Sequence, residues 1–231
     1  MIHNENSLSI VVFCNSDSYL HDVSHYPQEK SCKQSNLVRF TLRSNSLGLG
    51  QPTDLDFVSC LANATFLNFL LIGKNNFGGI FPSVICNFTR LSRLDLETNK
   101  IAGQIPSCIH NLVGLQGLYL LGNKLSGVIP SGAGKLQNLL YLDISANQLS
   151  GRIPSSIGNL THLTRVILSE NNLEGHIPST LGNLLGIALS CSAELPQERL
   201  QMSEVAAKLS SIKNKLRGIR SLQQRQILAG L

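Results

Sequence analysis

The sequence has no Trp, and among its 231 residues 5% are aromatic and 14% are charged. It also lacks the features that mark membrane spans and secretion signals. No stretch approaches the roughly 20 apolar residues that a membrane-spanning helix needs. Residues 1–20 hold one brief apolar run, LSIVVF, with no basic residue before it, which is too short for a secretory signal. We therefore expect neither a signal peptide nor a membrane span in this chain.

Signatures of catalysis and of metal binding are also missing. Ser, His and Asp residues occur without the nucleophile elbow of a hydrolase. His21 and His25 have the spacing of a helical metal site, but the glutamate and the third ligand of a zinc site are absent. The cysteines form no CxxC pair and have no metal-ligand spacing. We predict no catalytic residue, no metal site and no cofactor.

The net charge of +5 is concentrated at one end of the chain. Residues 196–231 hold seven Lys and Arg and two acidic residues, and residues 1–195 hold twelve of each sign. The excess therefore belongs to the tail, and we expect no nucleic-acid partner. The basic residues mostly flank a predicted amphipathic helix. We interpret them as a solvated helix face, with membrane-surface contact as the alternative.

A repeat of 24 residues dominates the middle of the chain. Asparagines recur at this spacing, with apolar residues five and three positions before each, a glycine four after and a proline seven after. The alternating apolar residues predict a short strand, and the glycine and proline predict a turn out of it. One such coil cannot bury its apolar side alone, so coils must stack. The sequence therefore predicts a solenoid with a parallel sheet along its concave face.

The repeated asparagine has a structural interpretation. Its amide can donate to and accept from backbone groups that are left unpaired inside the bend. We predict that these side chains form a ladder from coil to coil. The ladder residues are Asn75, Asn99, Asn123, Asn147 and Asn171.

This frame resembles the pattern LxxLxLxxNxLxGxIPxxLGNL of plant-specific leucine-rich repeats, found in the ectodomains of receptor-like kinases and receptor-like proteins. Five regular copies run from Leu67 to Leu184, and an irregular copy precedes them, with Asn45 placed 30 residues before Asn75. The extra residues include DLDF at 54–57, which resembles a repeat of the immune-receptor subfamily that senses bacterial flagellin and elongation factor. The resemblance implies an α/β-type solenoid with a concave parallel sheet and a short C-terminal helix.

The repeat frame fails after Leu184, because Leu195 stands where the next asparagine is due. The stretch 185–216 is similar to the last helical segment of the kinase domain in the same receptors. The matching residues are Cys191, Pro196, Arg199, Met202 and Val205. We therefore predict an irregular segment at 1–36, a solenoid at 37–184 and a kinase C-terminal-lobe remnant with a basic amphipathic helix at 185–231.

The motifs of a working kinase are absent. The sequence has no GxGxxG loop, HRD, DFG or APE, and phosphoryl transfer requires the groups that these motifs supply. The resemblance thus implies a truncated receptor in which part of an ectodomain joins the end of a kinase. We predict a protein that is not an enzyme.

Outward positions of the predicted strands are the candidate ligand site. They lie six, four, two and one residues before each ladder asparagine, and they differ from coil to coil while the inward positions stay aliphatic. Charged and aromatic side chains there can hold a peptide or protein ligand, with a co-receptor as a further candidate partner. The alternative is that they are solvated polar residues on too few coils to hold a ligand. The candidates are Arg93, Asp95, Glu97, Tyr119, Tyr141, Asp143 and Arg165.

Three glycosylation sequons share one repeat position. Asn63, Asn87 and Asn159 each lie twelve residues after a ladder asparagine or its expected place, in the return segment of the coil. The alternative is that N-x-T is local turn chemistry. Family resemblance implies the plasma membrane or the extracellular space.

The cysteines within the repeats are predicted to be buried free thiols. Cys60 and Cys108 occupy equivalent positions two coils apart, too distant to bridge easily because neighbouring strands lie about 4.8 Å apart. We expect Cys86 to be a buried thiol as well.

The leading functional hypothesis is a non-catalytic recognition module derived from a receptor-kinase ectodomain, with a role in plant defence signalling. Two alternatives stay open. One is a serine/threonine receptor kinase by parentage only, and the other is a non-functional gene fragment.

Overall fold

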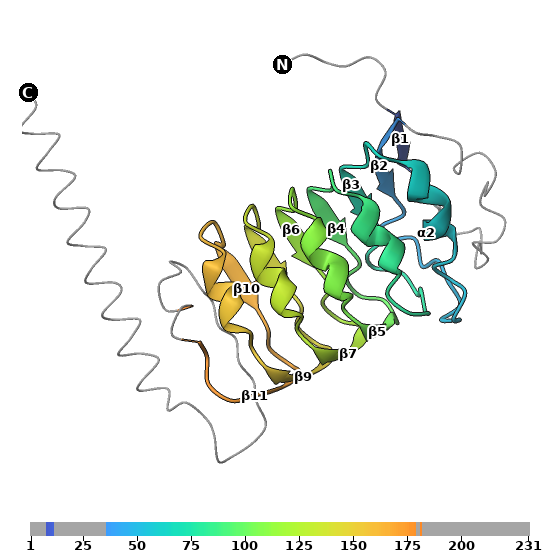
Figure 1. Cartoon of the computed structure of the whole chain (residues 1–231). Helices are drawn as coiled ribbons and strands as arrows, with labels where there is room; N and C mark the ends of the chain where they lie inside the picture. The colour runs from blue at the N-terminus through green and yellow to red at the C-terminus, as the bar shows by residue number, and fades with distance from the viewer. Residues whose placement is uncertain (1–7, 12–35, 179–180, 182–231) are drawn as a thin grey trace, which may run out of the picture. The chain divides into compact units, whose positions relative to one another are not determined.

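The computed structural model describes residues 8–11, 36–178 and 181 (Figure 1). The predicted C-terminal helix and kinase remnant at 185–231, and the histidine pair at 21 and 25, lie outside the described residues. Within the described part of the chain, no helix is long and apolar enough to cross a membrane.

The alternating apolar residues form the predicted strands, one per coil, and the strands pair in parallel (Figure 1). Pairing joins residues 24 positions apart, as in Leu94 with Leu118 and Leu118 with Leu142. The predicted solenoid with a parallel sheet is therefore confirmed. The seven strands, in spatial order, are β1 (Leu8–Val11), β2 (Leu37–Thr41), β3 (Phe69–Leu71), β4 (Arg93–Asp95), β6 (Gly117–Tyr119), β8 (Tyr141–Asp143) and β10 (Arg165–Ile167).

Strand β1 falls inside the segment that we expect to be irregular. Leu8–Val11 pairs in parallel with β2, with an irregularity in the register after Leu8. The first four residues of the apolar run, LSIV, thus supply an additional edge strand to the sheet.

A second parallel sheet runs through the part of each coil that we predict to be a turn. Its strands, in spatial order, are β11 (Asn172–Glu174), β9 (Gln148–Arg152), β7 (Lys124–Val128) and β5 (Ala102–Gln104). The repeat glycine lies within three of them, as at Gly127, whose φ is +75°. A Cβ at Gly127 would come 2.9 Å from Cγ of Gln104. The glycine therefore permits both the left-handed backbone and the close approach of neighbouring coils.

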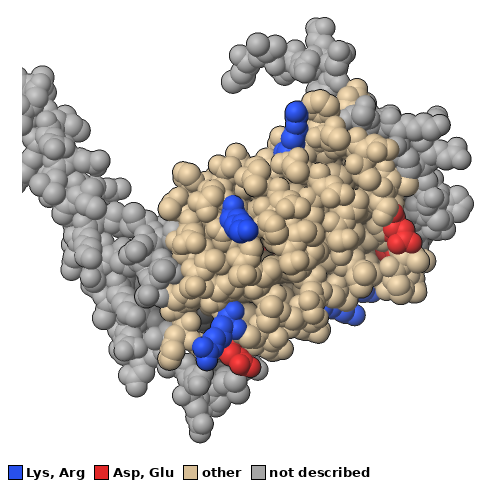
Figure 2. All heavy atoms as spheres, viewed as in Figure 1, with Lys and Arg blue, Asp and Glu red and all other residues tan. Residues whose placement is uncertain are grey.

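Short 3-10 helices complete the coils on the side opposite the seven-stranded sheet (Figure 1). The repeat proline is the N-cap of each regular helix and has φ between −73° and −60°. The face that carries these helices has few charged side chains (Figure 2). The helical elements are α2 (Phe57–Cys60), η2 (Leu61–Asn63), η3 (Ser83–Asn87), η4 (Ser107–Asn111), η5 (Ser131–Lys135) and η6 (Ser155–Asn159).

The core is a set of aliphatic columns between the two sheets and the helices. Leu70, Leu94 and Leu118 are at most 2% exposed, and burial of each such side chain stabilises the fold by about 1.5–3 kcal/mol. In the irregular coil, the column is supplemented by aromatic rings. Phe57 lies 5.8 Å from Phe40 and 5.7 Å from Phe77, between ring centroids.

The extra residues of the irregular coil have a structural role. Asp54, which is 8% exposed, accepts hydrogen bonds through Oδ2 from the backbone N–H groups of Leu49, Gly50 and Gln51. The same oxygen accepts from the N–H of Gly78, at 2.9 Å, in the next coil. Charge-assisted bonds to backbone N–H groups are stronger than neutral ones. The DLDF segment therefore holds a longer coil in register with the regular ones.

The repeated asparagines make the hydrogen bonds of a ladder. Nδ2 of Asn123 donates to the carbonyls of Leu96 (2.9 Å) in the preceding coil and Leu120 (3.0 Å) in its own, and Oδ1 accepts from the N–H of Ile101. The same pattern recurs at the other four ladder positions. Each amide thus satisfies backbone groups from two coils.

The expectation of free thiols is wrong. Cys86 and Cys108 form a disulfide with a Cα–Cα distance of 5.7 Å, and Cys60 is disulfide-bonded as well. Cys86 and Cys108 lie on successive 3-10 helices, 22 residues apart, so the offset between coils brings them within bridging distance. Cys86 lies one coil from Cys108, whereas Cys60 lies two coils away.

Candidate functional site

One row of side chains crosses six strands of the seven-stranded sheet. The row positions lie six residues before each ladder asparagine, and before Asn45 in the irregular coil, and they pair directly in the sheet register. In spatial order they are Arg39, Phe69, Arg93, Gly117, Tyr141 and Arg165.

The space beside the glycine of this row is filled by the ring of a neighbouring tyrosine. Tyr119 belongs to the same strand as Gly117, and a Cβ at Gly117 would lie 2.7 Å from Cε2 of Tyr119. The tyrosine ring therefore covers the glycine and stands in the row between Arg93 and Tyr141. We call Arg39, Phe69, Arg93, Tyr119, Tyr141 and Arg165 the arginine–aromatic row.

Two arginines of the row stack on its aromatic rings. Cζ of Arg39 lies 4.3 Å from the ring centroid of Phe69, and Cζ of Arg93 lies 4.4 Å from that of Tyr119. Such cation–π contacts contribute about 0.5–1 kcal/mol at exposed sites. They also limit the rotation of two otherwise flexible side chains.

Burial raises the pKa of the Tyr119 hydroxyl, and Arg93 opposes this rise. The ring is partly covered, whereas Tyr141 beside it is 44% exposed. Tyr141 is thus the aromatic side chain of the row that is most open to a partner. Arg93 and Arg165 are exposed as well.

A second group of charged residues lies on the same sheet, closer to the ladder. Arg43 forms ion pairs with Asp95 through Nη1 and with Glu97 through Nη2, and Nζ of Lys74 lies 3.9 Å from Oε1 of Glu97. Arg43 reaches these acids from two coils away, across Gly73. We call Arg43, Lys74, Asp95 and Glu97 the ion-pair cluster.

Gly73 makes the ion-pair cluster possible. A Cβ at this position would collide with Oδ1 of Asp95 and would lie 2.8 Å from Nη1 of Arg43. Any larger residue would therefore separate Arg43 from its acids. Because Gly73 has no side chain, the Arg43 guanidinium can pass over the intervening coil at this position.

Asp95 is 1% exposed beneath this arginine. Burial raises the pKa of its carboxyl group above the ordinary value, and the Arg43 guanidinium opposes the rise. Its Oδ1 accepts from the N–H of Glu97, at 3.2 Å. A ligand can reach Asp95 only if Arg43 moves.

Asp143 occupies the equivalent position two coils further on, but its carboxylate accepts hydrogen bonds from Ser145 and forms no ion pair with Arg43. Its Oδ1 accepts from the hydroxyl of Ser145 at 2.6 Å and from the N–H of the same residue at 3.2 Å. Asp143 is half-buried. The two aspartates of the predicted site are therefore both engaged within the protein.

The sheet thus divides the predicted ligand residues into two groups. Arg93, Tyr119, Tyr141 and Arg165 lie in the row, whereas Asp95, Glu97 and Asp143 face internal partners. Sequence reasoning missed Arg39 and Arg43, which precede Asn45 by six and two residues. The same positional rule, applied to the irregular repeat, finds both.

The sequon asparagines lie on another part of the coil. Asn63, Asn87 and Asn159 are exposed and end the 3-10 helices η2, η3 and η6. Each helix is on the side of the coil opposite the seven-stranded sheet. A glycan at any of the three would leave the row uncovered.

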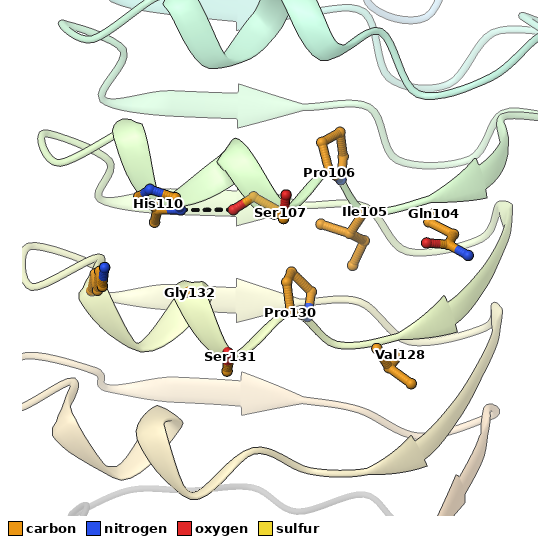
Figure 3. Close-up of a pocket in the computed structure, with 10 residues that line it drawn as sticks. Gln104, Ile105, Pro106, Ser107, His110, Val128, Pro130, Ser131 and Gly132 are labelled. Atoms are coloured by element: carbon orange, nitrogen blue, oxygen red, sulfur yellow. Dashed lines mark hydrogen bonds between the residues drawn. The ribbon is translucent and has the colours of Figure 1, made fainter.

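A groove of about 570 Å³ lies on this helical side, between two coils. Figure 3 shows Pro106 and Pro130 at the starts of successive helices, with Gly132 and His110 beside them. The carbonyl of Ser107 can only accept, so Nδ1 of His110 donates to it, at 2.7 Å. None of the predicted ligand residues lines this groove. Among the described residues, no cluster of His, Cys, Asp and Glu is arranged to hold a metal ion.

Comparisons with known proteins agree with this geometry. The leucine-rich-repeat family matches residues 90–112, 138–160 and 162–184. A search of curated proteins found no significant match. Among solved structures, the plant peptide hormone receptor RGFR1, in complex with RGF2, is 35% identical over 66% of this chain and 24% of its own, with a TM-score of 0.60.

Two further structures are of receptor kinases from Arabidopsis. The receptor kinase HAESA, solved with the peptide hormone IDA and the co-receptor SERK1, is 32% identical over 68% of this chain and 26% of its own, with a TM-score of 0.61. The ectodomain of the receptor kinase SOBIR1 from Arabidopsis thaliana is 32% identical over 60% of this chain and 73% of its own, with a TM-score of 0.52.

The fold and the repeat matches define a leucine-rich-repeat solenoid. Because the chain covers 73% of the SOBIR1 ectodomain at 32% identity, it belongs to the family of leucine-rich-repeat ectodomains of plant receptor kinases. It spans about a quarter of RGFR1 and of HAESA, with 24% and 26% of those chains covered.

Proposed function

We propose that this protein is a non-catalytic recognition module that binds a peptide or protein ligand along the arginine–aromatic row. One observation carries the proposal: six neighbouring strands line up arginines and aromatic rings, five at directly paired positions and the sixth through Tyr119, whose ring covers Gly117. Tyr and Arg are enriched among the residues that dominate binding energy at protein interfaces. The row combines both on a rigid sheet.

The scaffold beneath the row supports this function. Inward positions such as Leu118 and Leu142 are buried and constant in type, whereas their outward neighbours change from coil to coil. Stacked arginines and a covered tyrosine ring are already ordered before a ligand arrives. Such preorganisation reduces the entropic cost of binding.

We propose an extracellular location, at the surface of the plasma membrane. The Cys86–Cys108 disulfide supports it, because disulfides persist in oxidising compartments. The exposed sequon asparagines support it as well, and we propose Asn63, Asn87 and Asn159 as glycosylation sites. A co-receptor is the second partner that we propose, by analogy with HAESA, which was solved with SERK1.

The defence role and the parentage of the tail are also proposals. The DLDF segment at 54–57 supports membership of the subfamily that senses bacterial flagellin and elongation factor. The resemblance of residues 185–216 to the end of a kinase supports a truncated receptor, and the absence of HRD and DFG motifs supports a lack of catalysis. A radiolabelled-phosphate transfer assay should show no incorporation, and reproducible autophosphorylation would overturn the non-catalytic assignment.

The ligand surface is tested by selecting peptides from a random library against the purified full chain. We expect Tyr141→Ala to weaken the selected peptides by roughly tenfold or more, as at other interface hot spots. Val128→Ala is the matched control, because Val128 is an exposed apolar residue, at 58%, on the second sheet. Equal losses in the two variants would place the ligand elsewhere.

A further inference from the structure

Three acidic side chains of the concave sheet already have partners within the protein. Asp95 and Glu97 are held by Arg43, and Lys74 approaches Glu97. Asp143 accepts two hydrogen bonds from Ser145. Asp95 and Glu97 therefore have little remaining capacity for a basic ligand, and Oδ1 of Asp143 is already engaged.

The arginines of the row, in contrast, have no acidic partner within the described residues. Within residues 8–11, 36–178 and 181, no ion pair involves Arg39, Arg93 or Arg165. Arg93 lowers the pKa of the Asp95 carboxyl group, with the smallest effect of the groups that shift it. That carboxylate forms its ion pair with Arg43 instead. The unpaired charged groups of the row itself are therefore cationic.

Stacking prepares two of these arginines to bind an anion. A guanidinium held against the ring of Phe69 or Tyr119 at 4.3–4.4 Å keeps its N–H edge free, since the face alone contacts the ring. That edge matches a carboxylate with two parallel hydrogen bonds. The ring also reduces the side-chain freedom that binding would otherwise remove.

We infer that the ligand of the row is an acidic peptide that lies extended across the strands, with carboxylates on Arg39, Arg93 and Arg165 and apolar side chains against Tyr141. This inference rests on the proposed function and adds the chemical class of the ligand. It follows from charge complementarity, because the unpaired charged groups of the row carry one sign only.

The register also sets the spacing of the acids. Arg93 and Arg165 lie three strands apart, hence about 14 Å for strands about 4.8 Å apart. An extended peptide advances about 3.3 Å per residue, and residues i and i+4 point to the same side. Two acids four positions apart therefore match Arg93 and Arg165.

The test uses random peptides long enough to cross six strands, selected against the full chain. Selected peptides are resynthesised with each Asp and Glu replaced by its amide. We expect the enriched peptides to be acidic, and we expect Arg39→Gln with Arg93→Gln to weaken them by roughly tenfold or more. The amide peptides should lose a similar factor, and higher ionic strength should weaken only the acidic ones.

Matched variants separate a lost contact from a lost fold. Arg152→Gln removes an exposed arginine from β9 on the second sheet and should leave affinity unchanged. Arg93→Lys keeps the charge but loses the paired hydrogen bonds, so its affinity should fall between those of wild type and Arg93→Gln. Phe69→Leu should weaken the binding of acidic peptides although Arg39 is still present, because its guanidinium loses the ring on which it stacks.

The possible failures are distinguishable. If peptides bind and depend on Tyr141 but are neutral or basic, or ignore the arginine variants, the acidic-ligand inference is overturned while the proposed function stands. If no selected peptide responds to any row variant, both the proposed function and the inference fail.

Discussion

Gly73 determines whether the ion-pair cluster can form. Its backbone needs no left-handed conformation, so the requirement for glycine comes from space alone. Arg43 crosses the position that a Cβ would take on its way to Asp95 and Glu97. One missing methyl group thus links the irregular coil to a coil two repeats away.

We expect Gly73→Ala to lower the free energy of unfolding by about 1–3 kcal/mol, because the added methyl group forces apart a packed, charged cluster. Chemical denaturation measures the change. Gly114→Ala is the control, since its Cβ would meet its nearest atoms at 3.6 and 3.7 Å, an ordinary contact. That variant should be neutral or gain up to about 1 kcal/mol. Equal behaviour of the two variants would contradict the role of Gly73.

Asp95 should make stability depend on pH. Burial raises the pKa of its carboxyl group in the folded protein, so the folded state holds the proton more tightly than the unfolded chain does. The stabilisation from this group is complete below the unfolded pKa and is lost as pH rises through the folded pKa. Arg43→Met keeps most of the cover but removes the charge, and should raise the pKa further. Carboxyl-carbon NMR titration of both proteins checks this, and a lower pKa in the variant would refute it.

At the scale of one coil, the residue before each ladder asparagine has an unusual backbone. Lys74, Thr98, Ala146 and Glu170 have φ between +50° and +56°, and Gly122 has φ of +66°. L-residues avoid this left-handed region, and a β-branched residue does so most strongly. The bend therefore carries a conformational cost in the coils of Lys74, Thr98, Ala146 and Glu170, which the coil of Gly122 avoids.

Thr98 and Gly122 are equivalent positions in neighbouring coils, so opposite substitutions form a matched pair. We expect Thr98→Gly to raise the free energy of unfolding by about 0.5–1 kcal/mol, because relief of the left-handed strain exceeds the entropy cost of glycine. Gly122→Ala should lower it by about 1 kcal/mol. Changes of the same sign in a urea titration would show that contacts, and not backbone conformation, dominate there.

The regular coils could be predicted because one frame repeats over five copies, so each strand register follows from an asparagine and its apolar neighbours. The second sheet could not be predicted, because β5 and β7 are short and each contains the repeat glycine, which indicates a turn. In the site, the outward positions were predictable. The division into engaged acids and free arginines was not, because it depends on Arg43 reaching past Gly73. That reach has no sequence pattern.

At the scale of the whole solenoid, the Cys86–Cys108 disulfide joins successive helices near the N-terminal coils. It closes a segment with a sequence separation of 22 residues, and such a closure stabilises a fold by restricting the unfolded chain. We expect the double variant Cys86→Ala, Cys108→Ala to lose about 3 kcal/mol of unfolding free energy. Reduction of the wild type is a poorer test, because Cys60 is disulfide-bonded too. An unchanged denaturation midpoint in the double variant would show that the bond adds no stability.

The described solenoid presents two different long surfaces, a helical side with exposed sequons and a sheet side with the arginine–aromatic row. Recognition through the row is the central claim. It is tested most directly by placing the photo-crosslinking residue p-benzoylphenylalanine at position 141 or at position 128 and irradiating with a library-selected peptide. We predict a crosslink from position 141 and none from position 128, whereas a crosslink from position 128 alone would contradict recognition through the row.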